Sequence, residues 1–495
     1  RTAQLTKAFG DEEATGFPLG AVAQTGDRLN AGILAALDDL VGHGRDEAGF
    51  PSKGQGKPSA GQRGRDKARP SGRAAEFAHM SEEEAIDAPQ GRKPDSSKFR
   101  EGKFTYHQEV EVDIATITNL GDGLGRIDGW VVFIPGALPG EKVVARIWHN
   151  AANFSRGDLV RVIIPSASRV QPRCELFGEC GGCQYQNMAY AEQLVWKRKQ
   201  VAEVYERLGG LTVEVEPTHP SPKQYGYRSK ITPHFMTPRR ADFPIGFLAA
   251  GTSRRVVDVA KCPLATDAIN AAYARSRKDI RANPGRFERG ATLLFRDCQE
   301  GVVTDPRETV TEQVGRVKMK FLAGEFFQNN PSVLEDFVGH AIGLAKASGA
   351  KHLVDTYCGS GLFALSGARD FESVNGVEVS AEAARKAAEN ATLNGFVNCR
   401  FIAGSAESIF AKVPVRGPET AVIVDPPRRG CDESFLEQLH AFNPRRIVYI
   451  SCAPDTQARD LKYLCSRGWK VISAKPFDLF PQTRHVECIA ALEKA

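Results

Sequence analysis

The last third of the chain alternates short apolar runs with longer amphipathic stretches. Polar or glycine-rich residues follow each run. Between the runs, apolar positions recur at helical spacing. One such stretch begins at Ser332, which can cap a helix, and extends to Leu344. Strands that alternate with helices form a parallel sheet, so we predict a Rossmann-like α/β domain over residues 331–495. The apolar runs are residues 353–354, 374–377, 401–403, 421–424 and 447–450.

Upstream of this domain, apolar and polar positions alternate with the period of β-strands. Residues 110–116 show this alternation, and a glycine-rich turn follows at residues 119–125. Several short strands in succession predict a small β-barrel of the OB type over residues 106–168.

A β-rich central domain is predicted over residues 169–330, with strand-like segments such as residues 314–321. Within it, residues 225–230 are Tyr-Gly-Tyr-Arg-Ser-Lys, and Arg239 and Arg240 follow. Aromatic side chains between cations can stack on a single nucleic-acid strand and neutralise it. A half-exposed strand edge is an equally good interpretation of the same pattern.

We predict that residues 1–105 form a largely disordered extension, in which one amphipathic helix can begin at Asp27 and end at Gly42. Residues 51–73 carry seven Lys or Arg against the single Asp66, among Gly, Pro and Ser, a composition that cannot build a core. The segment is either a basic arm that contacts RNA phosphates or a solvated linker or targeting tail.

Composition narrows the class of protein. The net charge of +5 permits a nucleic-acid partner without establishing one. Eleven cysteines without a regular framework favour a reducing compartment, and no apolar run is long enough to cross a bilayer. We therefore expect an intracellular, cytoplasmic protein, with nucleus or mitochondrion as alternatives, no membrane association and no obligate protein partner.

A cysteine cluster marks the start of the central domain. Cys174, Cys180 and Cys183 lie within ten residues, with glycines that permit a tight turn, and Cys262 before a proline is the best fourth ligand. Thiolate ligation suits zinc or an iron–sulfur cluster, and spacing does not decide between them.

Polar groups follow four of the predicted strands. Asp355 precedes a Gly-x-Gly turn that is not a full dinucleotide motif, a form common in S-adenosylmethionine enzymes. Glu378, one strand later, can accept the ribose hydroxyls. Asp425 precedes two prolines, and Cys452 follows the run 447–450, where a thiol is either a nucleophile or an apolar filler.

Taken together, these segments resemble one family, the RNA uracil-C5 methyltransferases of the TrmA and RlmD kind. Residues 121–143 also resemble a TRAM domain, and the likeness extends from about Val110 to the end of the chain. The motifs are FFQNN, DTYCGSG, GVE, VDPPRRG, YISCAPDT and FDLFPQTRHVECIAAL.

The resemblance implies roles for individual residues. Cys452 corresponds to the nucleophile and Glu487 to the general base, while the four clustered cysteines correspond to the [4Fe–4S] ligands of ribosomal-RNA members, which favours iron–sulfur over zinc. The implied S-adenosyl-L-methionine contacts are Gln328, Tyr357, Gly361, Glu378, Ser405 and Asp425.

We therefore expect an S-adenosylmethionine-dependent RNA methyltransferase that forms 5-methyluridine, with a transfer-RNA T-loop uridine favoured as target. A ribosomal-RNA 5-methyluridine methyltransferase is the first alternative, and a non-catalytic RNA-binding or chaperone protein with the same fold is the second. An amino-group methyltransferase is disfavoured because it has no use for Asp425 before Pro-Pro or for a catalytic thiol.

Overall fold

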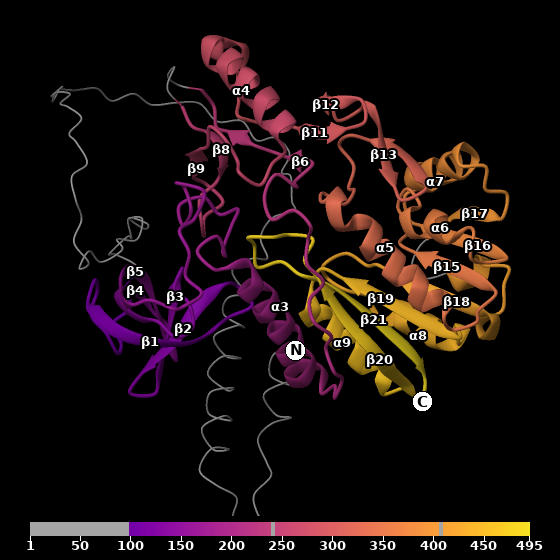
Figure 1. Cartoon of the computed structure of the whole chain (residues 1–495), viewed down its shortest axis with the longest axis horizontal. Helices are drawn as coiled ribbons and strands as arrows, with labels where there is room; N and C mark the ends of the chain where they lie inside the picture. Colours follow the sequence, from indigo (N-terminus) through magenta and orange to yellow (C-terminus); the bar gives the residue numbers. More distant parts are fainter. Residues whose placement is uncertain (1–98, 239–242, 405–408) are drawn as a thin grey trace, which may run out of the picture.

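The computed structural model describes residues 99–238, 243–404 and 409–495 in three parts: a barrel, a central domain and an α/β domain (Figure 1). The predicted helix at residues 27–42 and the proposed basic arm at residues 51–73 lie outside these ranges, as do Arg239, Arg240 and Ser405. No helix among the described residues has the length and apolar character needed to cross a membrane.

A closed five-stranded barrel begins the described chain, in the order β1-β2-β3-β5-β4. Its core collects the alternate inward positions, including Val112, Val132 and Val143. At Gly125 a Cβ atom would lie 2.3 Å from Val112, so only glycine permits this approach of two strands. The predicted small barrel is confirmed. Its strands are β1 (Glu109–Ile117), β2 (Asp122–Ile127), β3 (Trp130–Pro135), β4 (Lys142–Asn150) and β5 (Phe154–Ile164).

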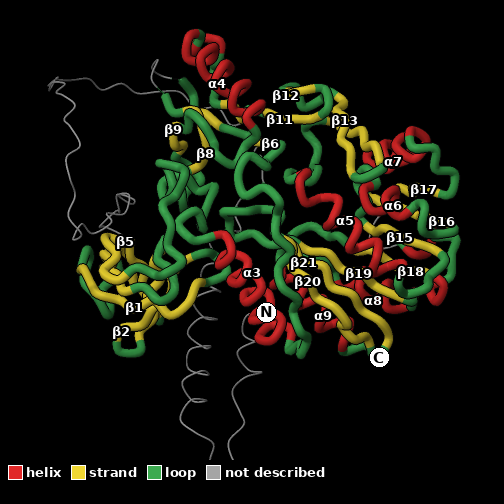
Figure 2. The backbone as a smooth tube through the Cα atoms, viewed as in Figure 1, coloured by secondary structure: helices red, strands yellow, loops and turns green. Residues whose placement is uncertain are grey.

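The central domain combines two helices with small antiparallel sheets (Figure 2). The helices are α3 (Tyr190–Val204), which continues into a π-helical turn at Tyr205–Gly209, and α4 (Asp267–Ala282). One sheet has the order β10-β7-β8-β9 and another β12-β11-β6. The strands are β6 (Lys230–Ile231), β7 (His234–Phe235), β8 (Ile245–Leu248), β9 (Val256–Asp258), β10 (Ala291–Thr292), β11 (Phe295–Cys298) and β12 (Gly301–Val303).

A two-stranded hairpin, β13 (Thr309–Val314) and β14 (Val317–Leu322), leads from the central domain to the α/β domain. Its inward residues, among them Met319 and Phe321, share one core with Phe337 of α5 (Pro331–Lys346). The hairpin therefore packs on the α/β domain, although the sequence pattern places it in the β-rich region.

The α/β domain is built on a seven-stranded sheet in the order β17-β16-β15-β18-β19-β21-β20. The first five strands pair in parallel, and β21 runs antiparallel between β19 and β20. The strands are β15 (His352–Thr356), β16 (Ser373–Glu378), β17 (Cys399–Ala403), β18 (Thr420–Val424), β19 (Arg446–Ser451), β20 (Trp469–Phe477) and β21 (Glu487–Lys494).

Helices cover both faces of this sheet, so its central strands are apolar on both sides. Leu353 belongs to the core under α5 and α6, whereas its neighbour Val354 belongs to the core under α8 and α9. This arrangement explains why the strands are continuous apolar runs and do not alternate. The helices are α5 (Pro331–Lys346), α6 (Leu362–Gly367), α7 (Ala381–Leu393), α8 (Glu433–Phe442) and α9 (Pro454–Cys465).

Candidate active site

Four strands of the α/β sheet end at one edge and present polar groups there. The register pairs Thr356 with both Val377 and Val424, and Val424 with Tyr449, so the parallel strands end nearly level. Their carboxyl ends are where open α/β sheets bind ligands. The residues at or just after these ends are Tyr357, Glu378, Asp425 and Cys452.

Cys452 and Glu487 lie opposite each other on neighbouring strands. In the antiparallel pair β19–β21, Ser451 is the partner of Cys488, so the next position on each strand brings Cys452 opposite Glu487. Burial, followed by the Glu487 charge, raises the pKa of the Cys452 thiol to about 11. Two residues 35 positions apart in the chain thus form one chemical unit.

Arg428 is the positively charged residue beside Cys452 and Glu487. The sequence patterns did not single it out as a site residue. Its side chain hydrogen-bonds Cys452 and, together with its charge, lowers the pKa of the thiol against the effect of burial. Thr456 holds the arginine in place by donating from Oγ1 to the Arg428 backbone oxygen at 3.0 Å. A cation immediately after Asp425-Pro-Pro was the signal that could have identified it.

Two carboxyl groups of the site have raised pKa values. Burial raises the pKa of Asp425 from 3.8 to about 7. Glu487 is 5% exposed, and burial followed by the Asp425 charge raises its pKa well above the usual value, with Arg428 opposing. Carboxyl groups in such surroundings bind protons more tightly and are stronger bases once ionised.

The turn after β15 is strained and held by Asp355. Tyr357 has φ +60° and Gly361 has φ +96°, both in the left-handed region. Asp355 Oδ2 accepts a hydrogen bond from the Ala364 backbone N–H at 2.8 Å, and burial raises the Asp355 pKa well above its usual value. Asp355 therefore fixes the turn onto α6, which leaves Tyr357 to face the site.

Glu378 is positioned to bind hydroxyl groups. Its Oε2 accepts from Gly359 N–H at 3.0 Å and its Oε1 from Ser380 N–H at 2.9 Å. Because each carboxylate oxygen can accept twice, a lone pair on each stays available for a ligand hydroxyl. A cavity of about 110 Å³ lies beside it, lined by Tyr357, Val377, Val379, Gly404, Ile409 and Arg429.

Gln328 lies on the loop that leads into α5. The residue is buried, and Asn330 two positions later caps α5 while donating to the Leu479 oxygen at 3.1 Å. Leu479 belongs to the loop that leads to Glu487. The Gln328 loop and the Glu487 loop are therefore in direct contact.

The four clustered cysteines come near one another but do not form a metal site as they stand. Cys174, Cys180 and Cys183 are each within the electrostatic reach of Cys262, whose backbone is bracketed by the Asn270 side chain at 2.9 and 3.0 Å. Across residues 99–238, 243–404 and 409–495, however, no three His, Cys, Asp or Glu residues are arranged to hold a metal ion.

The Tyr-Gly-Tyr-Arg-Ser-Lys segment supports the site from behind. Tyr227 is 1% exposed and donates from its hydroxyl to the Pro481 oxygen at 3.0 Å. The Lys230 ammonium donates to the oxygens of Gly324 and Glu325 at 3.1 and 3.2 Å. Both side chains fasten loops, and Lys230 lies half-buried on β6, the edge strand of its sheet, which agrees with the strand-edge interpretation.

These features define a class: an α/β protein with a ligand cavity at its strand ends and, at the same edge of the sheet, a thiol next to a buried carboxyl group. A family model described as "tRNA (Uracil-5-)-methyltransferase" matches residues 302–416 and 418–495, and a TRAM domain model matches residues 103–160.

Known proteins agree with this class. The chain is 42% identical to the tRNA (uracil(54)-C(5))-methyltransferase of Schizosaccharomyces pombe, covering 79% of each protein. It is 34% identical to the Saccharomyces cerevisiae protein of the same description, over 79% of this chain and 74% of that one. The solved Pyrococcus abyssi tRNA (uracil-54, C5)-methyltransferase in complex with S-adenosyl-L-homocysteine is 26% identical, with a TM-score of 0.61 over 77% of this chain and all of that one. The chain belongs to the tRNA (uracil-5-)-methyltransferase family, which confirms the resemblance found in the sequence.

Proposed function

We propose that the protein transfers a methyl group from S-adenosylmethionine to C5 of a uridine in transfer RNA, at the T-loop position that the relatives' names number 54. The observation that carries this proposal is the pairing of Cys452 with Glu487 across β19 and β21, beside Arg428. Methylation at C5 requires a nucleophile that adds to C6 and a base that removes the C5 proton, and this pair supplies both.

Cys452 begins the reaction by adding to the uracil ring. Its sulfur bonds to C6, and the electron pair of the C5–C6 double bond moves toward C5 and O4 as an enolate. This step makes C5, otherwise a poor nucleophile, able to attack an electrophilic methyl group. Arg428 favours the thiolate form of Cys452, which is otherwise scarce at neutral pH because burial raises the thiol pKa to about 11.

Glu487 completes the reaction. After methyl transfer, C5 carries both a methyl group and a proton, and the Glu487 carboxylate removes that proton. The electrons re-form the C5–C6 double bond and release the Cys452 thiolate. The buried setting of Glu487 raises its pKa and so strengthens it as a base.

We infer that the methyl donor binds at the strand ends of this Rossmann-like domain and that part of it occupies the cavity there. Glu378 has spare acceptor capacity for two ribose hydroxyls, and Tyr357 lines the cavity. When bound, S-adenosylmethionine supplies the electrophilic methyl group. The proposed contacts are Gln328, Tyr357, Gly361, Glu378 and Asp425, with Ser405 at the adenine.

The decisive experiment uses a labelled methyl donor, unmodified transfer RNA and nucleoside analysis. Wild-type protein forms 5-methyluridine, Cys452→Ala forms none, and Cys465→Ala, which changes a thiol remote from the site, retains activity. Glu487→Gln accumulates a covalent protein–RNA adduct that survives denaturing electrophoresis, because the thiol cannot be eliminated. Absence of 5-methyluridine with wild type, despite RNA binding, would instead support the non-catalytic alternative.

Ribosomal RNA is the second candidate substrate, favoured by the cysteine set. We propose that Cys174, Cys180, Cys183 and Cys262 bind an iron–sulfur cluster, or zinc, because four thiols in mutual reach suit either. Anaerobically purified protein with broad visible absorption and about four irons per chain supports the cluster. Colourless protein with one equivalent of zinc supports zinc, and protein without either metal contradicts both.

A further inference from the structure

Gln457 is a buried amide close to the Cys452–Glu487 pair, and the reaction chemistry described above does not use it. It lies on α9, five residues after Cys452, and its exposed fraction is 0%. A side-chain amide buried in this way costs free energy unless its N–H and C=O groups are hydrogen-bonded. The hydrogen-bond partners of Gln457 therefore indicate its role.

The Gln457 amide joins the two strands that place Cys452 and Glu487. Its Nε2 donates to the Tyr449 oxygen of β19 at 3.0 Å and to the Cys488 oxygen of β21 at 3.1 Å. Tyr449 lies three residues before Cys452 in the chain. Cys488 directly follows Glu487. Both N–H groups of the amide are thus used, one on each strand, next to the end of the sheet where the thiol and the carboxyl group lie opposite each other.

Tyr205 of the central domain fixes the orientation of this amide. Its hydroxyl donates to Gln457 Oε1 at 2.7 Å, and Cys488 Sγ lies 3.4 Å from the same hydroxyl. Tyr205 is 1% exposed and begins the π-helical turn that follows α3. Helix α9 packs on this turn and on α3 (Figure 1). One hydroxyl therefore contacts both the amide and the strand that begins at Glu487.

These contacts fix the base relative to the nucleophile. The Gln457 backbone N–H donates to the Ala453 oxygen at 3.1 Å, so the amide belongs to the same rigid turn as Cys452. Its bond to the Cys488 oxygen then holds the residue next to Glu487 at a set place relative to that turn. A displacement of about 1 Å at a reacting group can cost about 100-fold in rate.

We propose that Gln457, oriented by Tyr205, is a positioning residue that holds Glu487 where its carboxylate can remove the C5 proton. The proposal rests on the proposed function and deepens it, because it assigns the last step to this buried contact. If the proton stays on C5, the C5–C6 double bond does not re-form and the bond from C6 to the Cys452 sulfur does not break. Thiol addition and methyl transfer do not depend on the contact.

The test uses a methyl donor with a labelled methyl group, unmodified transfer RNA and denaturing electrophoresis. Gln457→Leu, which removes the amide, lowers kcat by about 10- to 100-fold. The KM for RNA does not rise, and labelled methyl accumulates in a covalent protein–RNA adduct. Tyr205→Phe, which removes only the hydroxyl, has a smaller effect of the same kind. The double variant resembles Gln457→Leu, because both changes act through one amide.

Gln200 provides a matched control for a loss of stability alone. It is also a buried glutamine, and its Nε2 donates to the Thr118 oxygen at 2.8 Å and to the Tyr185 hydroxyl at 3.0 Å. These contacts join α3 to the barrel, away from β19 and β21. Gln200→Leu loses stability to a similar extent in urea denaturation and accumulates no labelled adduct.

Three results would overturn the proposal. One is a Gln457→Leu protein with no more labelled adduct than Gln200→Leu, and another is a double variant whose kcat falls by the product of the two single losses. If Gln457→Leu does not fold, Tyr205→Phe decides by the same adduct measurement. The third is wild type that forms neither adduct nor 5-methyluridine, which overturns the proposed function as well. Active wild type with an unaltered adduct in the variants overturns the role of Gln457 alone.

Discussion

Two carboxyl side chains of the active site lie in surroundings that destabilise the folded protein, and a role in the reaction explains why they are present. Asp425 is placed where its ionised form is disfavoured, since burial raises its pKa from 3.8 to about 7. Asp355, also buried, has one oxygen bonded to Ala364 and the other without a partner. Such groups are retained at functional sites because a perturbed pKa or a free acceptor is useful there.

Asp425→Asn should make the protein more stable at pH 8. A raised carboxyl pKa contributes stability below the ordinary value of 3.8 and loses it as pH rises through about 7. Replacing the acid by its amide removes that loss, so we expect a gain of roughly 1–3 kcal/mol at pH 8 and less at pH 5. Urea denaturation at both pH values measures it. Equal effects on stability at the two pH values would contradict the raised pKa of Asp425. Because Asp425 lies in the proposed active site, we also expect methyl transfer to fall at both pH values.

Arg428→Ala should slow methyl transfer because less Cys452 is ionised. Without the guanidinium, the pKa of Cys452 rises further above about 11, so less thiolate is present near neutrality. We expect a loss of about 10- to 100-fold, as for a nucleophile one to two pKa units harder to ionise, and the same loss at pH 7 and pH 9 because both values lie below the thiol pKa. Arg428→Lys, which keeps a positive charge, should recover part of the activity. A loss that differs between pH 7 and pH 9, or no recovery with lysine, would assign Arg428 another role.

The loop between β20 and β21 shows how an element of the central domain places a residue of the α/β domain. Gln193 on α3 donates to Gln482 Oε1 at 3.0 Å and accepts from the Gln482 backbone N–H at 3.0 Å. Gln482 has φ +69°, a left-handed conformation that a non-glycine residue adopts at a cost. Lys197, one turn along α3, bonds Asp478 at 2.6 Å, with both side chains fully buried. The loop that ends at Glu487 is therefore shaped by α3.

Lys197→Met should destabilise the protein strongly. It leaves the Asp478 carboxylate buried without its cation, which costs about 3–5 kcal/mol. Asp478→Asn in the same chain should recover much of this loss, because the unpaired charge is gone. Urea denaturation of the single and double variants measures both effects. Lys199→Met, at a half-exposed position on the same helix, is the control.

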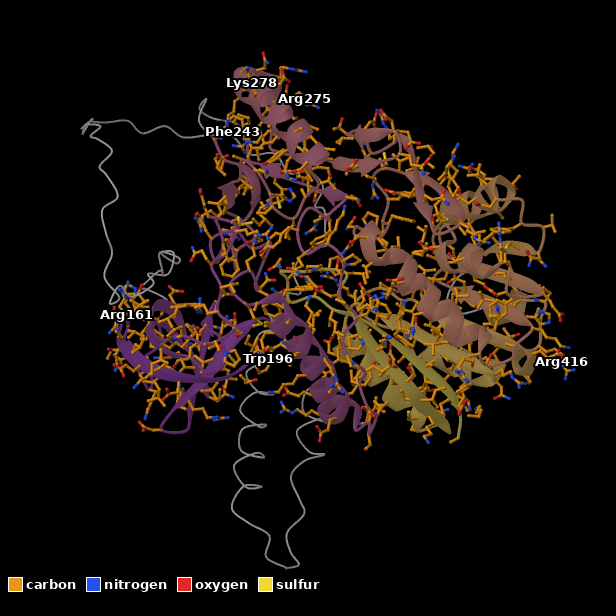
Figure 3. All side chains as sticks on the ribbon, in the orientation of Figure 1. Arg161, Trp196, Phe243, Arg275, Lys278 and Arg416 are labelled. Atoms are coloured by element: carbon orange, nitrogen blue, oxygen red, sulfur yellow. The ribbon has the colours of Figure 1, made fainter. Side chains whose placement is uncertain are left out.

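At the scale of the whole molecule, the barrel is joined to the rest of the chain through α3. Trp196, labelled in Figure 3, lies 8% exposed where α3 meets the barrel, in one cluster with Ile117 and Leu138. Glu141 of the barrel is buried and pairs with Arg169. Helix α3 therefore holds both the Glu487 loop and the barrel, and it fixes the position of each relative to the active site.

Trp196→Ala should loosen this junction. Loss of a buried tryptophan costs about 3–5 kcal/mol, and RNA affinity should fall while S-adenosylhomocysteine binding persists, because the cavity at the strand ends is distant in the fold. Denaturation, calorimetry and RNA binding measure the three effects. Val195→Ala, the exposed neighbour on the same helix, should change none of them. An equal loss of both ligands would mean that the α/β domain itself is disrupted.

The sequence by itself determined the elements and much of the chemistry. Continuous apolar runs, glycine turns and Pro-Pro breaks are local signals, so the barrel, the parallel strands and the strand-end positions of Glu378, Asp425 and Cys452 could be predicted. Family resemblance supplied Glu487, because nothing local distinguishes that residue from other strand-end acids.

Tertiary structure decided what lies next to what. Only the antiparallel register of β21 brings Glu487 opposite Cys452, and only the loop after Asp425 places Arg428 beside that thiol. The segment with Tyr227 and Lys230 was predicted at either an RNA surface or a strand edge. Lys230 does lie on the edge strand β6, but the loops that both side chains hold come from distant parts of the chain. The physical reason is that burial and pairing depend on distant parts of the chain, which no local pattern encodes.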